Sequence, residues 1–119
     1  ACAAALATFQ EFEEKDFGAR AQNLEKIARE ELEPILGDSR VAEFRGRGAM
    51  LALEFVTADG EPDSELVHKI AGGAKAEGVL LLTCGLDHNV IRFLPSLAIP
   101  EDLWREALQV VVKQFNEFK

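Results

Sequence analysis

Apolar residues recur at helical spacing through the first third of the chain. Three of them predict a helix over residues 3 to 13, and after an interruption at residues 15 to 18 a longer stripe predicts a second helix. The first set is Leu6, Phe9 and Phe12, and the second is Phe17, Ala21, Leu24, Ala28, Leu32 and Ile35. Pro34 and Gly37 mark the end of the second helix.

Alternating apolar and polar residues predict four strands. The first two cover residues 40 to 44 and 49 to 56, and the other two cover residues 79 to 82 and 89 to 94. Within the second strand, period two places Leu51, Leu53 and Phe55 on one face and Met50, Ala52 and Glu54 on the other.

Two further helices complete the pattern. Asp63 is placed to cap a helix that ends at Gly78, and Pro100 begins a last helix with acidic residues in its first turn. The apolar faces of these helices consist of Leu66, Val67, Ile70 and Ala74, and of Trp104, Ala107, Leu108, Val111 and Phe115. The order α-α-β-β-α-β-β-α predicts a single α+β domain over residues 1–119, with a small, mostly antiparallel sheet of about four strands and helices packed on one face.

The composition excludes several classes of function. With 119 residues and a formal charge of −8, the chain is long enough for one domain, and its acidic surface disfavours nucleic acid and anionic membranes as partners. No apolar run is long enough for a membrane span, and two cysteines suit a reducing cytoplasm better than a disulfide scaffold. Residues 1 to 6 contain neither an initiator Met nor a targeting signal, so we expect the chain to be a piece of a longer protein.

Few residues are candidates for metal binding or nucleophilic catalysis. Cys84 and His88 are four residues apart, and Cys2 and His68 lie elsewhere in the chain. A structural zinc site needs four ligands and usually a closely spaced cysteine pair, and a nucleophilic cysteine needs a second supporting feature. The chain has neither the zinc ligand set nor a feature that supports a nucleophilic cysteine, so we predict no metal site and no catalytic residue. We expect His68 to be exposed to solvent.

Two glycine motifs also have structural explanations. Gly72 and Gly73 fall inside a helical pattern and lack the context of a phosphate-binding loop, so close packing explains them better. The run 45 to 48, Arg-Gly-Arg-Gly, could expose backbone amides to an anion. Glycines at a strand junction more often mark a bulge or a close backbone approach, which is the interpretation we adopt.

Arg92 is the candidate binding residue. It lies in an apolar strand, on the face of Val90 and Leu94 and opposite Ile91 and Phe93. A guanidinium in such a place requires a planar anionic partner, and a carboxylate fits best. Taken alone, the strand leaves two alternatives open, namely an internal ion pair with one of the many Asp and Glu residues and a carboxylate ligand.

Four segments in the same order resemble the C-terminal small domain of the class III pyridoxal-phosphate aminotransferases, and within that family they are most similar to the 4-aminobutyrate aminotransferases. The resemblance covers essentially the whole chain. Its segments are residues 1 to 6 (ACAAAL), 45 to 54 (RGRGAMLALE), 76 to 82 (AEGVLLL), and 84 to 85 (CG) with 89 to 95 (NVIRFLP). In that family the small domain belongs to a fold-type I aminotransferase and is α+β.

The resemblance implies a role for Arg92 as the residue that binds the α-carboxylate of glutamate or 2-oxoglutarate. It also implies that a large-domain glutamate pairs with this arginine when 4-aminobutyrate is bound. The Schiff-base lysine and most contacts to pyridoxal 5'-phosphate would belong to the large domain, so no cofactor-binding residue is expected in this chain. Two positions depart from the family pattern: His88 replaces a frequent Gly, and Ser96 replaces a Pro.

The implied function is that of a 4-aminobutyrate transaminase, which transfers the amino group to 2-oxoglutarate and yields succinate semialdehyde and glutamate. The fragment would be inactive alone and would need the large domain of its own chain, reached through residues 1 to 16, and a second subunit of a homodimer. Another class III ω-amino transaminase, for ornithine or acetylornithine, is one alternative. A free-standing α+β ligand-binding module is the other, and the full-length gene would separate it from an enzyme domain.

Overall fold

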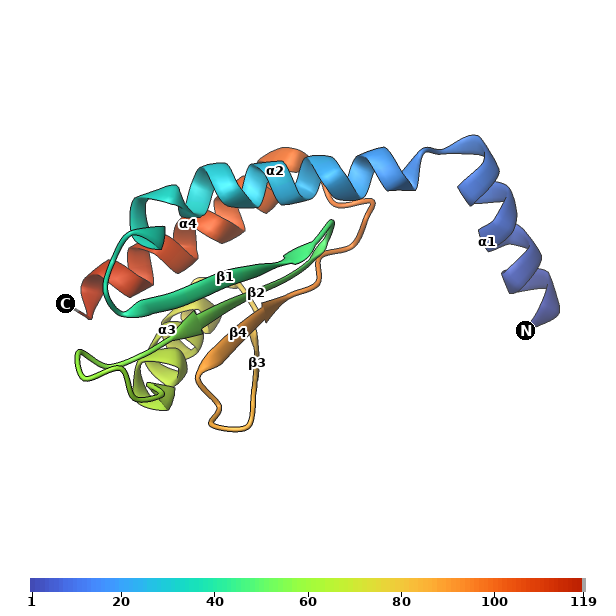
Figure 1. Ribbon diagram of the computed structural model, residues 1–119. Coiled ribbons are helices and arrows are strands. Elements are labelled where there is room, and N and C mark those ends of the chain that lie inside the picture. The colour runs from blue at the N-terminus through green and yellow to red at the C-terminus, as the bar shows by residue number, and fades with distance from the viewer. Residues whose placement is uncertain (119) are drawn as a thin grey trace.

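The computed structural model describes residues 1–118, which form four helices and one four-stranded sheet (Figure 1). The helices are α1 (Cys2–Glu14), α2 (Phe17–Leu36), α3 (Ser64–Ala76) and α4 (Glu101–Glu117), and the strands are β1 (Val41–Arg47), β2 (Met50–Phe55), β3 (Leu82–Cys84) and β4 (Val90–Phe93). Neighbouring strands are antiparallel in the order β1-β2-β4-β3. The predicted α+β architecture is confirmed.

The core lies between one face of the sheet and the three helices α2, α3 and α4 (Figure 1). Leu51, Leu53 and Phe55 of β2 point into it and are at most 1% exposed, as the alternation predicts. The helices contribute most of the predicted apolar stripes, to which the structure adds Ile27. Phe17 of the predicted stripe lies outside this core. The indole nitrogen of Trp104 donates a hydrogen bond of 3.0 Å to the Leu24 carbonyl and joins α4 to α2.

Side-chain caps determine where two helices begin. The carboxylate of Asp16 accepts a hydrogen bond from the Ala19 amide at 2.8 Å, and that of Asp63 accepts one from the Leu66 amide at 2.9 Å. Each satisfies an amide that the first turn of a helix leaves without an intrahelical partner. The cap at Asp63 is the predicted one.

The first strand is longer than predicted. Instead of ending at residue 44, β1 continues to Arg47, which pairs with Met50 across a turn at Gly48 and Ala49. Gly46 has a φ of 138°, and a Cβ there would lie 2.2 Å from the Met50 carbonyl oxygen, so the run 45 to 48 is a close backbone approach. The Gly48 amide donates to Glu25 at 2.6 Å and is therefore not open to an external anion.

The prediction of a strand over residues 79 to 82 is wrong, because β3 begins only at Leu82. Pairing with β4 extends from Leu82 opposite Arg92 to Cys84 opposite Val90. The preceding segment completes the end of α3 instead, since the Val79 amide donates to the Ala74 carbonyl at 2.9 Å. β4 is likewise shorter than the predicted strand over residues 89 to 94.

Helix α1 projects away from the rest of the molecule (Figure 1). It buries no residue, and Leu6, Phe9 and Phe12 are 58–67% exposed. Its contact with α2 is an edge-on packing of Phe12 on Phe17, with ring centroids 5.1 Å apart. Within residues 1–118, no helix is both long and apolar enough to cross a membrane.

Candidate functional site

The helices leave the second face of the sheet open, and Arg92 lies on it. The strand register places Arg45 of β1 opposite Ala52 of β2, and Ala52 opposite Arg92 of β4. Residues that pair directly across strands point to the same face, so these three side chains form one row on the open side. Leu82 of β3, opposite Arg92, ends the row.

The Arg92 guanidinium has no anionic partner within the described residues. Arg92 is exposed, and none of the Asp and Glu residues among 1–118 forms an ion pair with it. The residue opposite it on β2 is alanine, which offers neither charge nor bulk. The sequence left open an internal ion pair and a carboxylate ligand. Residues 1–118 do not form the internal ion pair.

Arg45, the other arginine of the row, is paired with two carboxylates of the sheet. Its guanidinium donates to Glu54 at 2.6 Å and to Glu43 at 2.9 Å. The hydrogen bond to Glu54 is the main reason that the pKa of Arg45 is raised above its ordinary value. Arg45 and Arg92 flank the same alanine but differ in their partners. Arg45 is paired with carboxylates of its own sheet, whereas Arg92 is open to an external anion.

A shallow hollow of about 400 Å³ lies over this part of the sheet. Arg45, Ala52, Cys84 and Arg92 contribute to its lining, together with Met50, which is 63% exposed. An apolar floor beside an unpaired guanidinium suits a small organic anion with a carboxylate at one end, because a planar fork can donate two parallel hydrogen bonds to a carboxylate.

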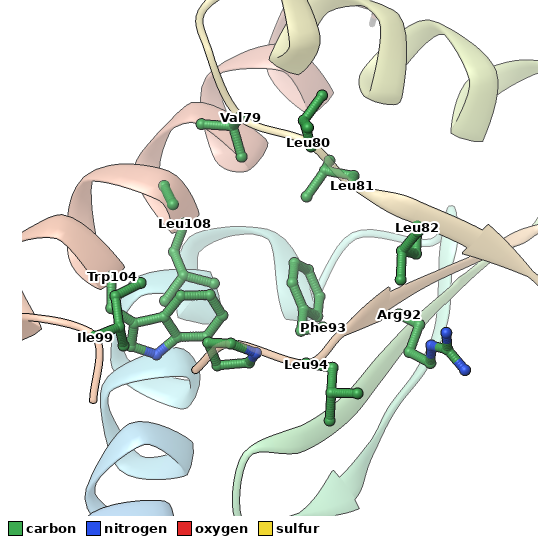
Figure 2. A pocket seen from close by; sticks show the side chains of 12 residues that line it. Val79, Leu80, Leu81, Leu82, Arg92, Phe93, Leu94, Ile99, Trp104 and Leu108 are labelled. Carbon is green, nitrogen blue, oxygen red and sulfur yellow. The ribbon is translucent and has the colours of Figure 1, made fainter. Parts of the chain in front are cut away.

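A second, apolar hollow of about 210 Å³ lies on the other side of Arg92 (Figure 2). The segment from Val79 to Leu82, the end of β4 and the first turns of α4 line it, with Phe93 and Trp104 packed edge to face at 6.1 Å. Figure 2 shows the guanidinium of Arg92 directed away from Trp104 and Leu108. The guanidinium of Arg92 therefore points toward the open face and away from this hollow.

The turn before β4 fixes the register that places Arg92. Asn89 is buried, and its side-chain amide donates a hydrogen bond of 2.9 Å to the Phe55 carbonyl. The Phe55 amide in turn donates to the Asn89 carbonyl at 2.9 Å. His88 has a φ of 54°, in the left-handed region that favours glycine, and Gly85 has a φ of 90°. The sequence alone does not predict this structural role of Asn89, although a polar residue at the start of an apolar strand is a usable signal.

The remaining sequence candidates do not form a site. Among residues 1–118, no three His, Cys, Asp or Glu side chains lie close enough to hold a metal ion. Cys2 and Cys84 are free thiols, and His68 is exposed with Nδ1 at 2.6 Å from the Ser64 carbonyl. Gly73 packs against Gln114, as the close-packing interpretation requires. For Gly72 that interpretation is wrong, because a Cβ there would meet nothing within 4 Å.

The family model for aminotransferase class III matches residues 1–115. The chain belongs to the class III aminotransferase family. It is 42% identical over 99% of its length to the 4-aminobutyrate aminotransferase of Mycobacterium leprae, and 37% identical over 98% to the 5-aminovalerate aminotransferase of Pseudomonas aeruginosa. It spans 27% and 28% of the length of these relatives.

A solved transaminase structure supports the α+β fold of this chain. An amine transaminase from an uncultivated Pseudomonas species matches 98% of this chain with a TM-score of 0.84 and 29% identity, and the match covers 27% of that protein. The same fold is matched by other solved aminotransferases of fold type I.

Class III aminotransferases depend in general on pyridoxal 5'-phosphate, but the described residues around Arg92 do not fit that cofactor. Neither hollow beside Arg92 is lined by a lysine. Lys15, Lys26, Lys69 and Lys113 instead form ion pairs on helix surfaces. Within residues 1–118, no lysine amine therefore lies beside the Arg92 guanidinium to hold this cofactor.

Proposed function

We propose that this chain is the small domain of a 4-aminobutyrate transaminase and that Arg92 binds the α-carboxylate of its substrates glutamate and 2-oxoglutarate. The observation that carries the proposal is the unpaired guanidinium of Arg92 on the open sheet face, opposite Ala52. The similarity to 4-aminobutyrate aminotransferases over nearly the whole chain supports the choice of reaction.

In the proposed reaction the chain recognises and orients a substrate. A guanidinium fixed on a strand binds a carboxylate through two parallel hydrogen bonds, which determines both the position and the rotation of the substrate. The relative that acts on 5-aminovalerate shows that related enzymes use other ω-amino donors, and ornithine and acetylornithine belong to the same class of alternatives. Arg92 would have the same role with each of them, because the 2-oxo acid acceptor is unchanged.

The rest of the machinery is proposed to lie outside this chain. A large domain of the same polypeptide would hold pyridoxal 5'-phosphate, which supplies the electron sink for amino transfer, and a second subunit would complete a homodimer. Residues 1 to 16 would lead into that large domain, in accordance with the absence of buried residues in α1. The 119-residue chain alone would be inactive, and its two free cysteines agree with a cytoplasmic enzyme.

The test is Arg92→Lys in the full-length enzyme, which keeps the charge but removes the planar fork. Turnover of glutamate and 2-oxoglutarate should lose about 1.5–3 kcal/mol of transition-state stabilisation, the range for a hydrogen bond to a charged group. The half-reaction with 4-aminobutyrate should lose less, since this donor has no α-carboxylate. Single-turnover kinetics of the two half-reactions measure both values.

Arg105→Lys is the matched control, because Arg105 forms its ion pairs with Glu30 and Glu31 on the helical side of the domain. It should leave both half-reactions unchanged. Equal losses in both half-reactions of the Arg92→Lys enzyme would contradict the proposal and make Arg92 a structural residue.

A further inference from the structure

Glu54 has the same geometric relation to two arginines. On the open face, Ala52 pairs with Arg45 on one side and with Arg92 on the other, and Glu54 is the next outward-facing residue of β2. Glu54 is therefore a diagonal neighbour of both guanidinium groups. Diagonal neighbours on one sheet face are roughly 7–8 Å apart at their backbones, within the reach of Glu and Arg side chains.

Only one of these two diagonal ion pairs forms. Glu54 Oε2 accepts a hydrogen bond of 2.6 Å from Arg45, and no ion pair joins Glu54 to Arg92 in the described part of the chain. Glu43, which pairs with Glu54 in the register, accepts from the same nitrogen of Arg45 at 2.9 Å. Arg45 is thus held between two carboxylates, and Glu54 is committed to β1 instead of β4.

We propose that Arg45 is a positioning residue that keeps Arg92 available for the substrate α-carboxylate by holding Glu54 on the opposite side of β2. The inference rests on the proposed function for the role of Arg92, but the competition between the two arginines is a property of the sheet itself. Without Arg45, Glu54 would turn to its second diagonal neighbour, and an internal carboxylate would compete with the substrate for the same guanidinium.

The first experiment measures the state of Arg92 without reference to activity. In the full-length enzyme, phenylglyoxal modifies accessible, unpaired arginines, and mass spectrometry gives the labelling rate of Arg92 alone. Arg45→Met should slow this rate roughly two- to fivefold, the range for competition by an exposed ion pair. Arg45→Met combined with Glu54→Gln should restore the rate, because the amide has no charge with which to hold Arg92.

Two further variants separate positioning from folding. Arg45→Lys keeps an ion pair with Glu54 and should label Arg92 at nearly the parental rate. If Arg45→Met fails to fold, Arg45→Gln provides the same loss of charge with a polar side chain that tolerates the exposed strand. An unchanged labelling rate in the folded charge-loss variant, or a slowed rate that Glu54→Gln does not restore, would overturn the inference.

The second experiment connects the competition to substrate binding. Arg45→Met should raise the KM for 2-oxoglutarate and for glutamate by the same two- to fivefold factor with little change in kcat, and Glu54→Gln should reverse the rise. Slowed labelling of Arg92 with no change in either KM would support the positioning role and overturn the proposed function of Arg92. Unchanged labelling with the parental KM would overturn the positioning role and leave the proposed function intact.

Discussion

The buried side chain of Asn89 donates a hydrogen bond to the Phe55 carbonyl and thereby ties the start of β4 to the end of β2. The backbone amide of Phe55 donates back to the Asn89 carbonyl, so the two residues are joined twice. Because Arg92 lies three residues further along β4, this junction determines which residue of β2 it faces. The position of Arg92 on the open face therefore depends on a polar contact on the buried side of the sheet.

Asn89→Ala should destabilise the fold by about 1–3 kcal/mol, since it removes a buried hydrogen bond and leaves the Phe55 carbonyl with fewer donors. Urea unfolding of the chain, followed by circular dichroism, measures the change. Asn23→Ala is the control, because the amide of Asn23 bonds Glu101 at the surface, and this change should cost less than about 0.5 kcal/mol. Equal effects of the two substitutions would contradict the structural role of Asn89.

His88→Gly should stabilise the protein. His88 is held at a φ of 54°, where a residue other than glycine pays a steric cost on the order of 1 kcal/mol. A gain of about 0.5–1 kcal/mol is expected, and His88→Val should be destabilising because a β-branched residue is worse in this region. The thermal midpoints of the three proteins should fall in the order Gly, His, Val. Asp87→Gly, at a neighbouring position without a positive φ, should give no gain.

The two adjacent glycines of α3 should respond oppositely to alanine. At Gly72 a Cβ meets nothing within 4 Å, so Gly72→Ala should stabilise the helix by about 0.5–1 kcal/mol. At Gly73 a Cβ would lie 1.7 Å from Oε1 of Gln114. The Gln114 side chain is buried, and its Nε2 donates a hydrogen bond of 2.5 Å to Glu77. Gly73→Ala should therefore destabilise the chain, as urea midpoints would show.

A double variant checks the cause of the Gly73 effect. When Gln114→Ala is made first, the obstructing side chain is gone and Gly73→Ala should then be tolerated. Additive losses in the double variant would mean that packing against Gln114 is not the reason for the glycine.

The isolated chain should either self-associate through α1 or show fraying of this helix. Leu6, Phe9 and Phe12 present an exposed apolar stripe, and a helix of this length without packing is marginal in water. Light scattering and hydrogen exchange over residues 3 to 13 distinguish the two outcomes. Phe9→Glu should abolish association, whereas Gln10→Glu should not. A strict monomer with strongly protected α1 amides would contradict this expectation.

Local patterns were sufficient for most of the helices and for the faces of β2. The apolar stripes of α2, α3 and α4 and the cap at Asp63 are properties of residues within one or two turns of each other, so the sequence alone indicates them. The alternation along β2 likewise separates Leu53 from Ala52 without reference to other strands. Similarity over four segments was enough to predict the family.

Strand ends and the state of Arg92 were decided only by the tertiary structure. β3 starts at Leu82, not at residue 79, because pairing with β4 extends only that far, and a pairing partner is not visible in the strand's own sequence. Whether Arg92 has an internal partner likewise depends on register, which places Ala52 opposite it and leaves Glu54 to Arg45. An acidic chain offers many carboxylates to an arginine, and only the distances between residues far apart in the sequence determine which of them reach it.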